Sequence, residues 1–321
     1  MIRALAYTAG KTQAVADEEI AAAIAGRARN GFLWVHLEGE RGSPLLEELP
    51  VELPPTVERA LTATETRPRC EPFETGVLVN LRAPPTEGNQ PGHDPLMSVR
   101  LWAEKGLLLS VAFRPSPVIS DAETQFAAGA LIDPGDVIIA IASAAAERLD
   151  EDVAALGDRL DDIECTVDQS TPFSERREVT ALRTRAIGLR RFIVPQRLAL
   201  ERLASLPLDW LDDEERAKVR EAADQFARMG EELESVRERA AVIHEELTDL
   251  RSERIDARSL QIAIVALIFL PLTFVTGLLG MNVEGIPYAG EPWAFWGVVA
   301  FCVLIAAGVA GWFAWRRWSD R

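Results

Sequence analysis

The stretch Ser259–Asn282 reads SLQIAIVALIFLPLTFVTGLLGMN, and it decides how the rest of the chain is interpreted. No Asp, Glu, Lys or Arg occurs in the 25 residues from Ser259 to Val283. A helix rises ~1.5 Å per residue, so about 20 apolar residues cross a hydrocarbon core of ~30 Å. The length and composition of this stretch therefore predict a membrane-spanning helix.

A second uncharged stretch, Pro292–Trp315, has 24 residues and carries tryptophans near both ends. Tryptophan favours the membrane–water interface, so this stretch predicts a second span. The segment between the spans contains Glu284 and Glu291 but no Lys or Arg. Arginines instead precede the first span and follow the second: Arg251, Arg254, Arg258, Arg316, Arg317 and Arg321. The positive-inside rule therefore predicts a multi-pass protein of the inner (plasma) membrane with both termini in the cytoplasm.

The overall composition limits the classes of function that fit. The formal net charge of −16 argues against a nucleic-acid partner and favours the accumulation of cations near the surface. The three cysteines lie far apart and indicate no disulfide framework. No nucleophile–base pair and no phosphate-binding glycine loop stands out, so we do not expect an enzyme.

Residues 1–130 have the pattern of an α/β domain. Asp17–Gly31 and Pro55–Ala63 have helical patterns. Four stretches have strand patterns: Phe32–Gly39, Gly76–Arg82, Met97–Ala103 and Gly106–Phe113. These elements predict a small, mostly antiparallel sheet flanked by helices. His36 lies in the first of these apolar strands, so we expect a core histidine rather than a metal ligand.

Residues 131–258 are predicted to be helical throughout. Asp133–Gln169 and Ser174–Leu206 form two runs, the second with a kink expected near Pro195. The third run begins at Asp209 and contains no proline before Pro271. Continued to Asn282, it would be one helix of 74 residues, or ~110 Å at 1.5 Å per residue.

Two faces of this long helix carry opposite patterns. One is an unbroken heptad seam, expected to pack on a partner helix such as Ser174–Leu206. Its members are Phe226, Met229, Leu233, Val236, Ala240, Ile243, Leu247 and Leu250. The other face, displaced two positions or about 200° from the seam, is a polar stripe interrupted only by Val242. Its members are Glu238, Glu245, Asp249, Ser252, Asp256 and Ser259. This polar stripe is either a solvated face or, if copies of the helix surround an axis, the lining of a cation path.

Two spans in one chain cannot enclose a path for a solute. The chain is therefore either an anchored cytoplasmic domain or one subunit of an oligomer whose first spans surround an axis. The small or hydroxylated residues Thr273, Thr276 and Gly277 permit close helix approach. Pro271 leaves backbone groups that only protein or water can satisfy. These residues favour the oligomer.

The end of the first span resembles the CorA superfamily of divalent-cation channels and transporters. The signature is Gly280-Met281-Asn282, which ends a charge-free span between a long stalk and a short acidic loop. The approach PLTF-x-x-G, Pro271–Gly277, also matches. Within the superfamily, the Gly-Ile-Pro that follows resembles the ZntB zinc-transporter branch. Glu284 departs from that branch, which commonly has glycine there, and is more similar to the magnesium channels.

The resemblance implies a homopentamer, α+β in its cytoplasmic funnel domain, with a very long stalk helix and two C-terminal transmembrane helices. Asn282 would contact a hydrated cation at the outer mouth of the pore through its amide oxygen. Leu270, Thr273, Gly277 and Gly280 would face the lumen, with Leu270 as a hydrophobic constriction. Glu245 would line the cytoplasmic pore. Independently of the resemblance, Glu284 and Glu291 are expected to concentrate cations outside, and His244 beside Glu245 is a candidate zinc ligand.

The predicted organisation has six parts. They are a cytoplasmic α/β domain (1–130), a helical and stalk region (131–258), a pore-lining first span (259–282), a periplasmic loop (283–291), a second span (292–315) and a cytoplasmic basic tail (316–321).

The expected partners are other copies of the chain, the lipid bilayer and a transported divalent cation, with zinc favoured and no resident cofactor. The ZntB branch also implies proton coupling, although neither span contains a carboxylate or histidine for a proton relay. Two alternatives stay open: a magnesium or cobalt channel of the same superfamily, and a membrane-anchored coiled-coil scaffold or sensor.

Overall fold

The computed structural model describes residues 1–39, 49–63, 66–86, 95–166, 172–281, 285–286, 288 and 290–319. Within these residues the chain forms two compact units, Met1–His244 and Glu245–Arg321, which are described in turn. Helix α6 (Asp213–Leu279) contributes residues to both units.

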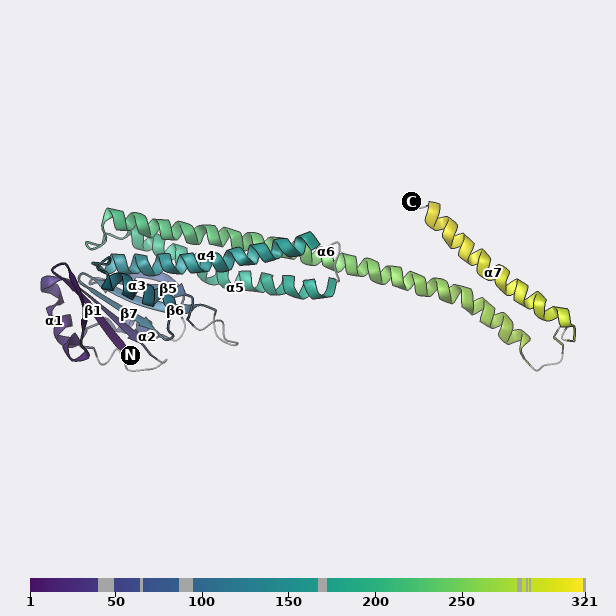
Figure 1. Cartoon of the computed structure of the whole chain (residues 1–321), viewed down its shortest axis with the longest axis horizontal. Helices are drawn as coiled ribbons and strands as arrows, with labels where there is room; N and C mark the ends of the chain where they lie inside the picture. Colours follow the sequence, from purple (N-terminus) through teal and green to yellow (C-terminus); the bar gives the residue numbers. More distant parts are fainter. Residues whose placement is uncertain are drawn as a thin grey trace. The chain divides into compact units, whose positions relative to one another are not determined.

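A seven-stranded sheet with the order β2-β1-β3-β7-β6-β5-β4 forms the centre of the first unit (Figure 1). Its strands are β1 (Ile2–Thr8), β2 (Lys11–Val15), β3 (Phe32–Glu38), β4 (Arg69–Pro72), β5 (Val77–Ala83), β6 (Met97–Glu104) and β7 (Leu107–Ala112). Strands β3 and β7 pair in parallel, and the other described pairs are antiparallel. The expectation of a mostly antiparallel sheet is confirmed, although β1, β2 and β4 were not expected from the sequence.

Helices cover both faces of this sheet, so its central strands are buried along nearly their whole length. On one face, α1 (Ile20–Asn30), which follows a short 3₁₀ turn at Asp17–Glu19, and α2 (Pro55–Thr62) share a core with Leu33, Val35 and Leu37 of β3. On the other face, α3 (Pro117–Ala127) brings the ring of Phe126 to 5.9 Å from that of Trp34. Alternate residues of β3 therefore belong to two different cores.

The helix α5 (Pro172–Ser205) is joined to the edge of the sheet by one buried side chain. Gln196 accepts a hydrogen bond from the backbone N–H of Arg82 at 2.6 Å and donates one to the carbonyl of Arg82 at 3.1 Å. The amide of Gln196 thus pairs with the backbone of β5 beyond the end of β4, whose pairing with β5 stops at Arg69 and Asn80. Helix α5 contains Pro195 in its interior, and the kink expected there stays a prediction.

Helices α4 (Pro134–Thr166), α5 and the first part of α6 lie side by side (Figure 1). The heptad seam of α6 is buried from Phe226 to Leu247, as predicted. Arg239 of α6 forms ion pairs with Asp161 and Glu164 of α4. On the other side of α6, Glu234 Oε2 lies 3.1 Å from Arg190 Nε of α5. The partner of the seam is therefore the pair α4 and α5, where the sequence had suggested α5 alone.

Helix α6 has 67 residues and begins at Asp213 rather than at Asp209. The delay has a local cause at Asp212. Its side-chain Oδ1 accepts a hydrogen bond from the backbone N–H of Glu215 at 2.8 Å, which is the geometry of an N-cap. Residues 206–211 instead form turns, with the backbone N–H of Leu211 donating to the carbonyl of Leu208.

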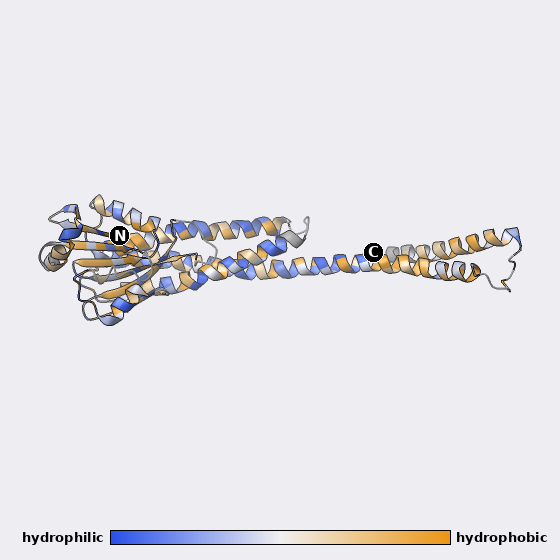
Figure 2. Cartoon of the chain, turned by 90° about the horizontal axis from the view of Figure 1, so that it is seen from below, coloured by the Kyte–Doolittle hydropathy of each residue, from blue (hydrophilic) through white to orange (hydrophobic). Residues whose placement is uncertain are grey.

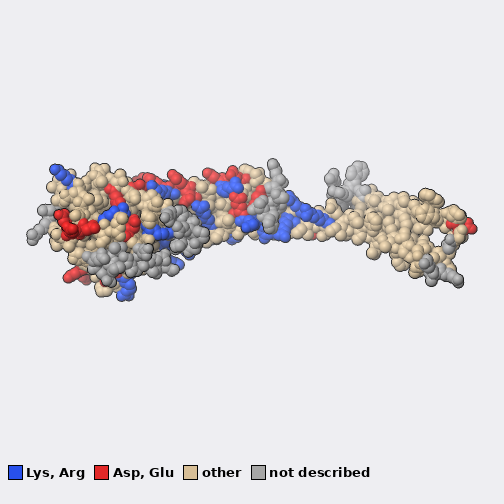
Figure 3. Space-filling model, turned by 60° about the horizontal axis from the view of Figure 1, so that its bottom comes forward, with Lys and Arg blue, Asp and Glu red and all other residues tan. Residues whose placement is uncertain are grey.

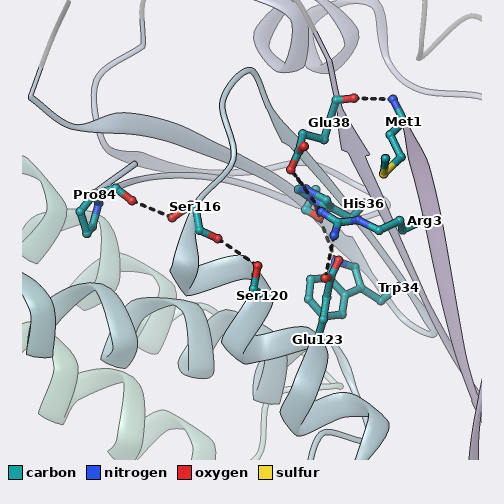
Figure 4. A network of polar contacts seen from close by, with 10 residues as sticks. Met1, Arg3, Trp34, His36, Glu38, Pro84, Ser116, Ser120 and Glu123 are labelled. Atoms are coloured by element: carbon teal, nitrogen blue, oxygen red, sulfur yellow. Dashed lines mark hydrogen bonds and ion pairs between the residues drawn. The ribbon is translucent and has the colours of Figure 1, made fainter. Parts of the chain in front are cut away.

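His36 is a buried core histidine, as expected, and belongs to a polar network beneath β1 and β3 (Figure 4). Ser110 Oγ accepts a hydrogen bond from Trp34 Nε1 at 2.8 Å and lies 2.7 Å from His36 Nδ1. The Ser110 hydroxyl either donates to Nδ1 of a neutral ring that carries its proton on Nε2, or accepts from a protonated Nδ1. Arg3 completes the network by bridging Glu38 and Glu123 at 3.2 and 2.9 Å.

Acid is expected to destabilise the protein through His36. Burial, with smaller contributions from the charges of Arg3 and the N-terminal amino group, lowers the pKa of His36 from 6.5 to about 3. The unfolded chain therefore binds a proton that the folded chain excludes, and stability is lost as the pH falls from 6.5 towards 3. Because one pKa unit corresponds to about 1.36 kcal/mol, lowering the pH from 7 to 5 should cost about 2 kcal/mol through this residue.

Urea unfolding of the detergent-solubilised full chain, followed by the fluorescence of the buried Trp34 and Trp102, measures this loss. His36→Asn should reduce the pH dependence by about the same 2 kcal/mol, whereas His244→Asn, at a half-buried position, is the matched control. An equal pH dependence in His36→Asn and the wild type would contradict the assignment.

The second unit contains the end of α6 and α7 (Pro292–Ser319), which Figure 2 colours mostly as hydrophobic. Two helical segments are long and apolar enough to cross a membrane, one within α6 and one at Pro292–Phe313. None of the residues in either apolar window is buried within the chain. Phe269, Leu270 and Phe274 are all more than half exposed. Such a surface requires lipid or other copies of the chain around it.

Candidate cation path

The polar stripe of α6 is exposed along its whole length, opposite the buried seam. All six members, from Glu238 to Ser259, are exposed, and Val242 is 65% exposed. Glu238 lies 3.7 Å from Arg237. Within the described residues, Glu245, Asp249 and Asp256 form no ion pair.

The same helical face continues into the first span. Steps of three and four residues lead from Ser259 through Ala263 and Ala266 to Leu270, Thr273, Gly277 and Gly280. α6 remains helical over this range as far as Leu279, including Pro271. Leu270 is 76% exposed, and a Cβ placed on Gly277 would meet nothing within 4 Å. One face of a single helix therefore carries carboxylates at one end and small or hydroxylated residues at the other.

The two threonines of the span have hydroxyl groups suited to contact with a cation. Thr273 Oγ1 donates to the carbonyl of Phe269 at 2.7 Å, and Thr276 Oγ1 donates to that of Leu272 at 2.9 Å. Each hydroxyl proton is thus used within the helix, which leaves the oxygen lone pairs as the outward group. Of the two, Thr273 belongs to the predicted lumen face.

The outer end of the path is only partly described. The backbone N–H of Gly280 donates to the carbonyl of Thr276 at 2.9 Å, which closes the last turn. Met281 is 49% exposed, and Glu291 is exposed one residue before α7. Asn282 and Glu284, predicted to sit at the mouth, lie outside the described residues, and so do residues 283, 287 and 289 of the loop and residues 320–321 of the basic tail.

His244 and Glu245 are adjacent in sequence but turn to different sides of the helix. His244 Nδ1 lies 3.5 Å from Thr180 Oγ1 of α5, in a groove that Arg176, Arg177 and Arg185 also line. Glu245 belongs to the exposed polar stripe. Three guanidinium groups beside the histidine disfavour a cation there, and no third ligand joins the pair among the described residues. The zinc role of this pair stays a prediction.

Charge is distributed unevenly along the chain. Figure 3 shows side chains of both signs crowded over the first unit and nearly absent from the segment that holds the two spans. Arg251, Arg254 and Arg258 are exposed on α6 just before the uncharged stretch. By the positive-inside rule, these arginines predict that the α6 end of the first span faces the cytoplasm.

Known proteins share both the sequence and the fold of this chain. The family model described as CorA-like Mg2+ transporter protein matches residues 29–317. The zinc transport protein ZntB of Pectobacterium atrosepticum is 30% identical over 288 residues, which cover 89% of this chain and 87% of that protein.

Two solved structures are similar over the full length. The full-length CmaX protein has a TM-score of 0.77 at 30% identity, covering 98% of this chain and 96% of its own. The CorA magnesium transporter of Methanocaldococcus jannaschii has a TM-score of 0.77 at 16% identity, covering 98% and 97%. The second likeness supports the fold alone. The long family match and the 30% identity to ZntB show that the chain belongs to the family of CorA-like Mg2+ transporter proteins.

Proposed function

We propose that this chain transports zinc across the inner membrane along the axis of a homopentamer, with the polar stripe and the lumen face of α6 as the path. Membership of the family supports divalent-cation transport in general. The relative named as a zinc transport protein supports zinc among these cations. The observation that carries the proposal is the continuous face of α6, exposed and acidic at one end and small and hydroxylated at the other.

An oligomer is proposed because a single chain leaves the apolar surfaces of both spans unburied. Two spans cannot surround a path, and the apolar windows of both are unburied within the chain. An oligomer that places α6 around an axis covers part of this surface and brings the polar stripes together. Five copies is the number that the resemblance to the CorA superfamily implies. The cytoplasmic placement of both termini remains the prediction of the positive-inside rule.

Selection in the membrane is expected to act on a hydrated ion. A tight zinc site uses Cys or His ligands, and the only such residue in the two spans is Cys302, on the second span. Neutral oxygens of Thr273 and Asn282 can contact the water shell of a cation without holding it too long. The transported ion would then be a substrate that passes through, not a resident cofactor.

Magnesium is the second candidate for the transported ion. The description of the matching family names Mg2+, and Glu284 departs from the zinc-transporter pattern. Oxygen ligands and a retained water shell also suit Mg2+. The scaffold function that the sequence left open has no support from the family.

Flux into liposomes tests the proposal. The purified full chain is reconstituted with a zinc-sensitive dye inside, and zinc is added outside with or without excess Mg2+ or Co2+. We expect a zinc-dependent signal above that of empty liposomes, a smaller signal with Asn282→Ala, and stronger competition by Co2+ than by Mg2+. No signal above empty liposomes would overturn the proposal, and complete competition by Mg2+ would favour the second candidate. A native mass other than five chains would contradict the pentamer alone.

A further inference from the structure

Helices α4 and α6 begin with similar arrangements of hydrogen bonds. Before α6, Glu215 Oε2 accepts from the backbone N–H of Asp212 at 2.6 Å, which completes a reciprocal capping box. Before α4, Asp133 Oδ1 accepts from the backbone N–H of Asp136 at 2.9 Å. Asp136 Oδ2 in turn accepts from the backbone N–H of Ile132 at 2.9 Å. Each of these capping carboxylates uses one oxygen in a backbone hydrogen bond, and its second oxygen is available to another partner.

The fold brings these two helix starts together. One carboxylate oxygen from each of Asp133, Asp136 and Glu215 lies within 4.8 Å of the others. Glu215 reaches the start of α4 because residue 135 is a glycine: a Cβ there would lie 2.3 Å from Glu215 Oε1. A side chain at this position would push the Glu215 carboxylate away from α4.

The hydrogen bonds at the two helix starts do not include Glu215 Oε1. The residue is only 5% exposed, and its Oε1 has no hydrogen-bond partner in the part of the chain that the structure describes. A buried carboxylate oxygen without a partner costs free energy, so something is expected to satisfy it.

Nearby cations are engaged elsewhere. Arg216 donates to the carbonyls of Ala204, Leu206 and Leu208, and Lys218 pairs with Glu214 at 2.8 Å. Among the described residues, no Lys or Arg forms an ion pair with any of the three carboxylates. The Glu215 and Asp133 carboxyl groups lie within hydrogen-bond reach of each other, so a proton shared between them is the alternative to a metal ion. The charge of Lys218 acts on Asp136 at longer range, without an ion pair.

We propose that Asp133, Asp136 and Glu215 bind a hard divalent cation of the Mg2+ class, which joins the start of α4 to the start of α6. The ligand set contains only oxygen, which suits Mg2+ or Mn2+ better than zinc, whose tight sites use Cys or His. All three residues belong to the first unit and to none of the predicted pore positions. The site is thus separate from the proposed transport path, and neither proposal depends on the other.

Counting bound Mn2+, a paramagnetic substitute for Mg2+, tests the site on the full chain in detergent. Equilibrium binding followed by electron paramagnetic resonance should find one Mn2+ fewer per chain in Glu215→Gln than in the wild type. Glu214→Gln is the matched control, because it removes the same charge one residue earlier from an exposed side chain. It should keep the wild-type number. Equal numbers in Glu215→Gln and the wild type would overturn the proposal.

Thermal unfolding gives a second measurement and separates a metal ion from a shared proton. At pH 8.5, Mg2+ at about 100 times its Kd should raise the Tm of the wild type by about 5–10 °C. Mg2+ should not raise the Tm of Glu215→Gln in this way. If a proton alone satisfies Glu215, the wild-type Tm will fall as the pH rises from 6 to 9 and Mg2+ will not restore it, which contradicts the proposal.

A second variant covers the case in which Glu215→Gln fails to fold. Asp136→Asn keeps an oxygen for the Ile132 N–H and leaves the capping box of α6 intact. It removes one charged ligand, so the affinity of this site for Mn2+ should fall at least about tenfold. Mutation of residues that only hydrogen-bond to a metal ligand already lowers metal affinity by about 10–100-fold. Unchanged affinity would contradict the proposal.

Discussion

Replacing Leu270 with asparagine is expected to raise the resting zinc flux in liposomes at least about tenfold. Leu270 is 76% exposed within the chain and is the only large apolar residue on its face of the span. The other positions of that face hold serine, alanine, threonine and glycine. A ring of leucines among such small neighbours would form the narrowest apolar constriction, which can close a pore by excluding water. Amides there would admit water, and a barrier lowered by 1.4 kcal/mol already gives a tenfold change.

Leu272→Asn is the matched control for this prediction. It makes the same change two residues later, about 200° around the helix from Leu270, where the side chain is half exposed. An asparagine there is expected to weaken insertion or assembly without opening the path. Flux is compared per assembled protein, measured by size-exclusion chromatography. Equal flux in Leu270→Asn and the wild type, or equal increases in both variants, would contradict a constriction at Leu270.

The architecture of the long helices was predictable because their signals are repeated many times. The heptad seam of α6 recurs over eight positions, and the absence of charge extends over both spans. Errors occurred where the signal is short. Strands β2 and β4 have five and four residues and lie at the edges of the sheet, where fewer residues need to be apolar. Strand β1 has seven residues but is only partly buried, so its apolar signal is weak.

The polar stripe was predictable for the same reason, but single contacts between distant residues were not. Gln196 looks like an ordinary helix residue, and only the fold shows that its amide pairs with the backbone of β5 beyond the end of β4. The sequences Asp133-Pro-Gly-Asp136 and Asp212-Asp-Glu-Glu215 both have the spacing of helix caps. Their separation in sequence concealed that the two caps meet. Conversely, the role of Asn282 rests on sequence alone, because it lies outside the described residues.

Neutralising two carboxylates of the polar stripe, as Glu245→Gln with Asp249→Asn, is expected to lower zinc flux about tenfold at low ionic strength. Both side chains are exposed and form no ion pair with the described residues, so their charge acts on whatever lies in front of them. In a pentamer the double variant removes ten charges from the path. Clefts lined by one sign of charge raise local ion concentration and entry rates by about 10–10³-fold, and the lower end of that range suits a water-filled path.

The ionic-strength dependence distinguishes a charged path from a structural defect. Charge effects are screened over ~10 Å at 0.1 M salt and over ~3 Å at 1 M. The loss of flux should therefore shrink to less than about twofold at 1 M salt, whereas a misfolded variant would stay inactive. The control is Glu246→Gln with Glu253→Gln, which removes the same number of charges one position around the helix, about 100° from the polar stripe. If both double variants lose flux equally, the carboxylates of α6 act as a solvated surface and the cation path does not follow the polar stripe.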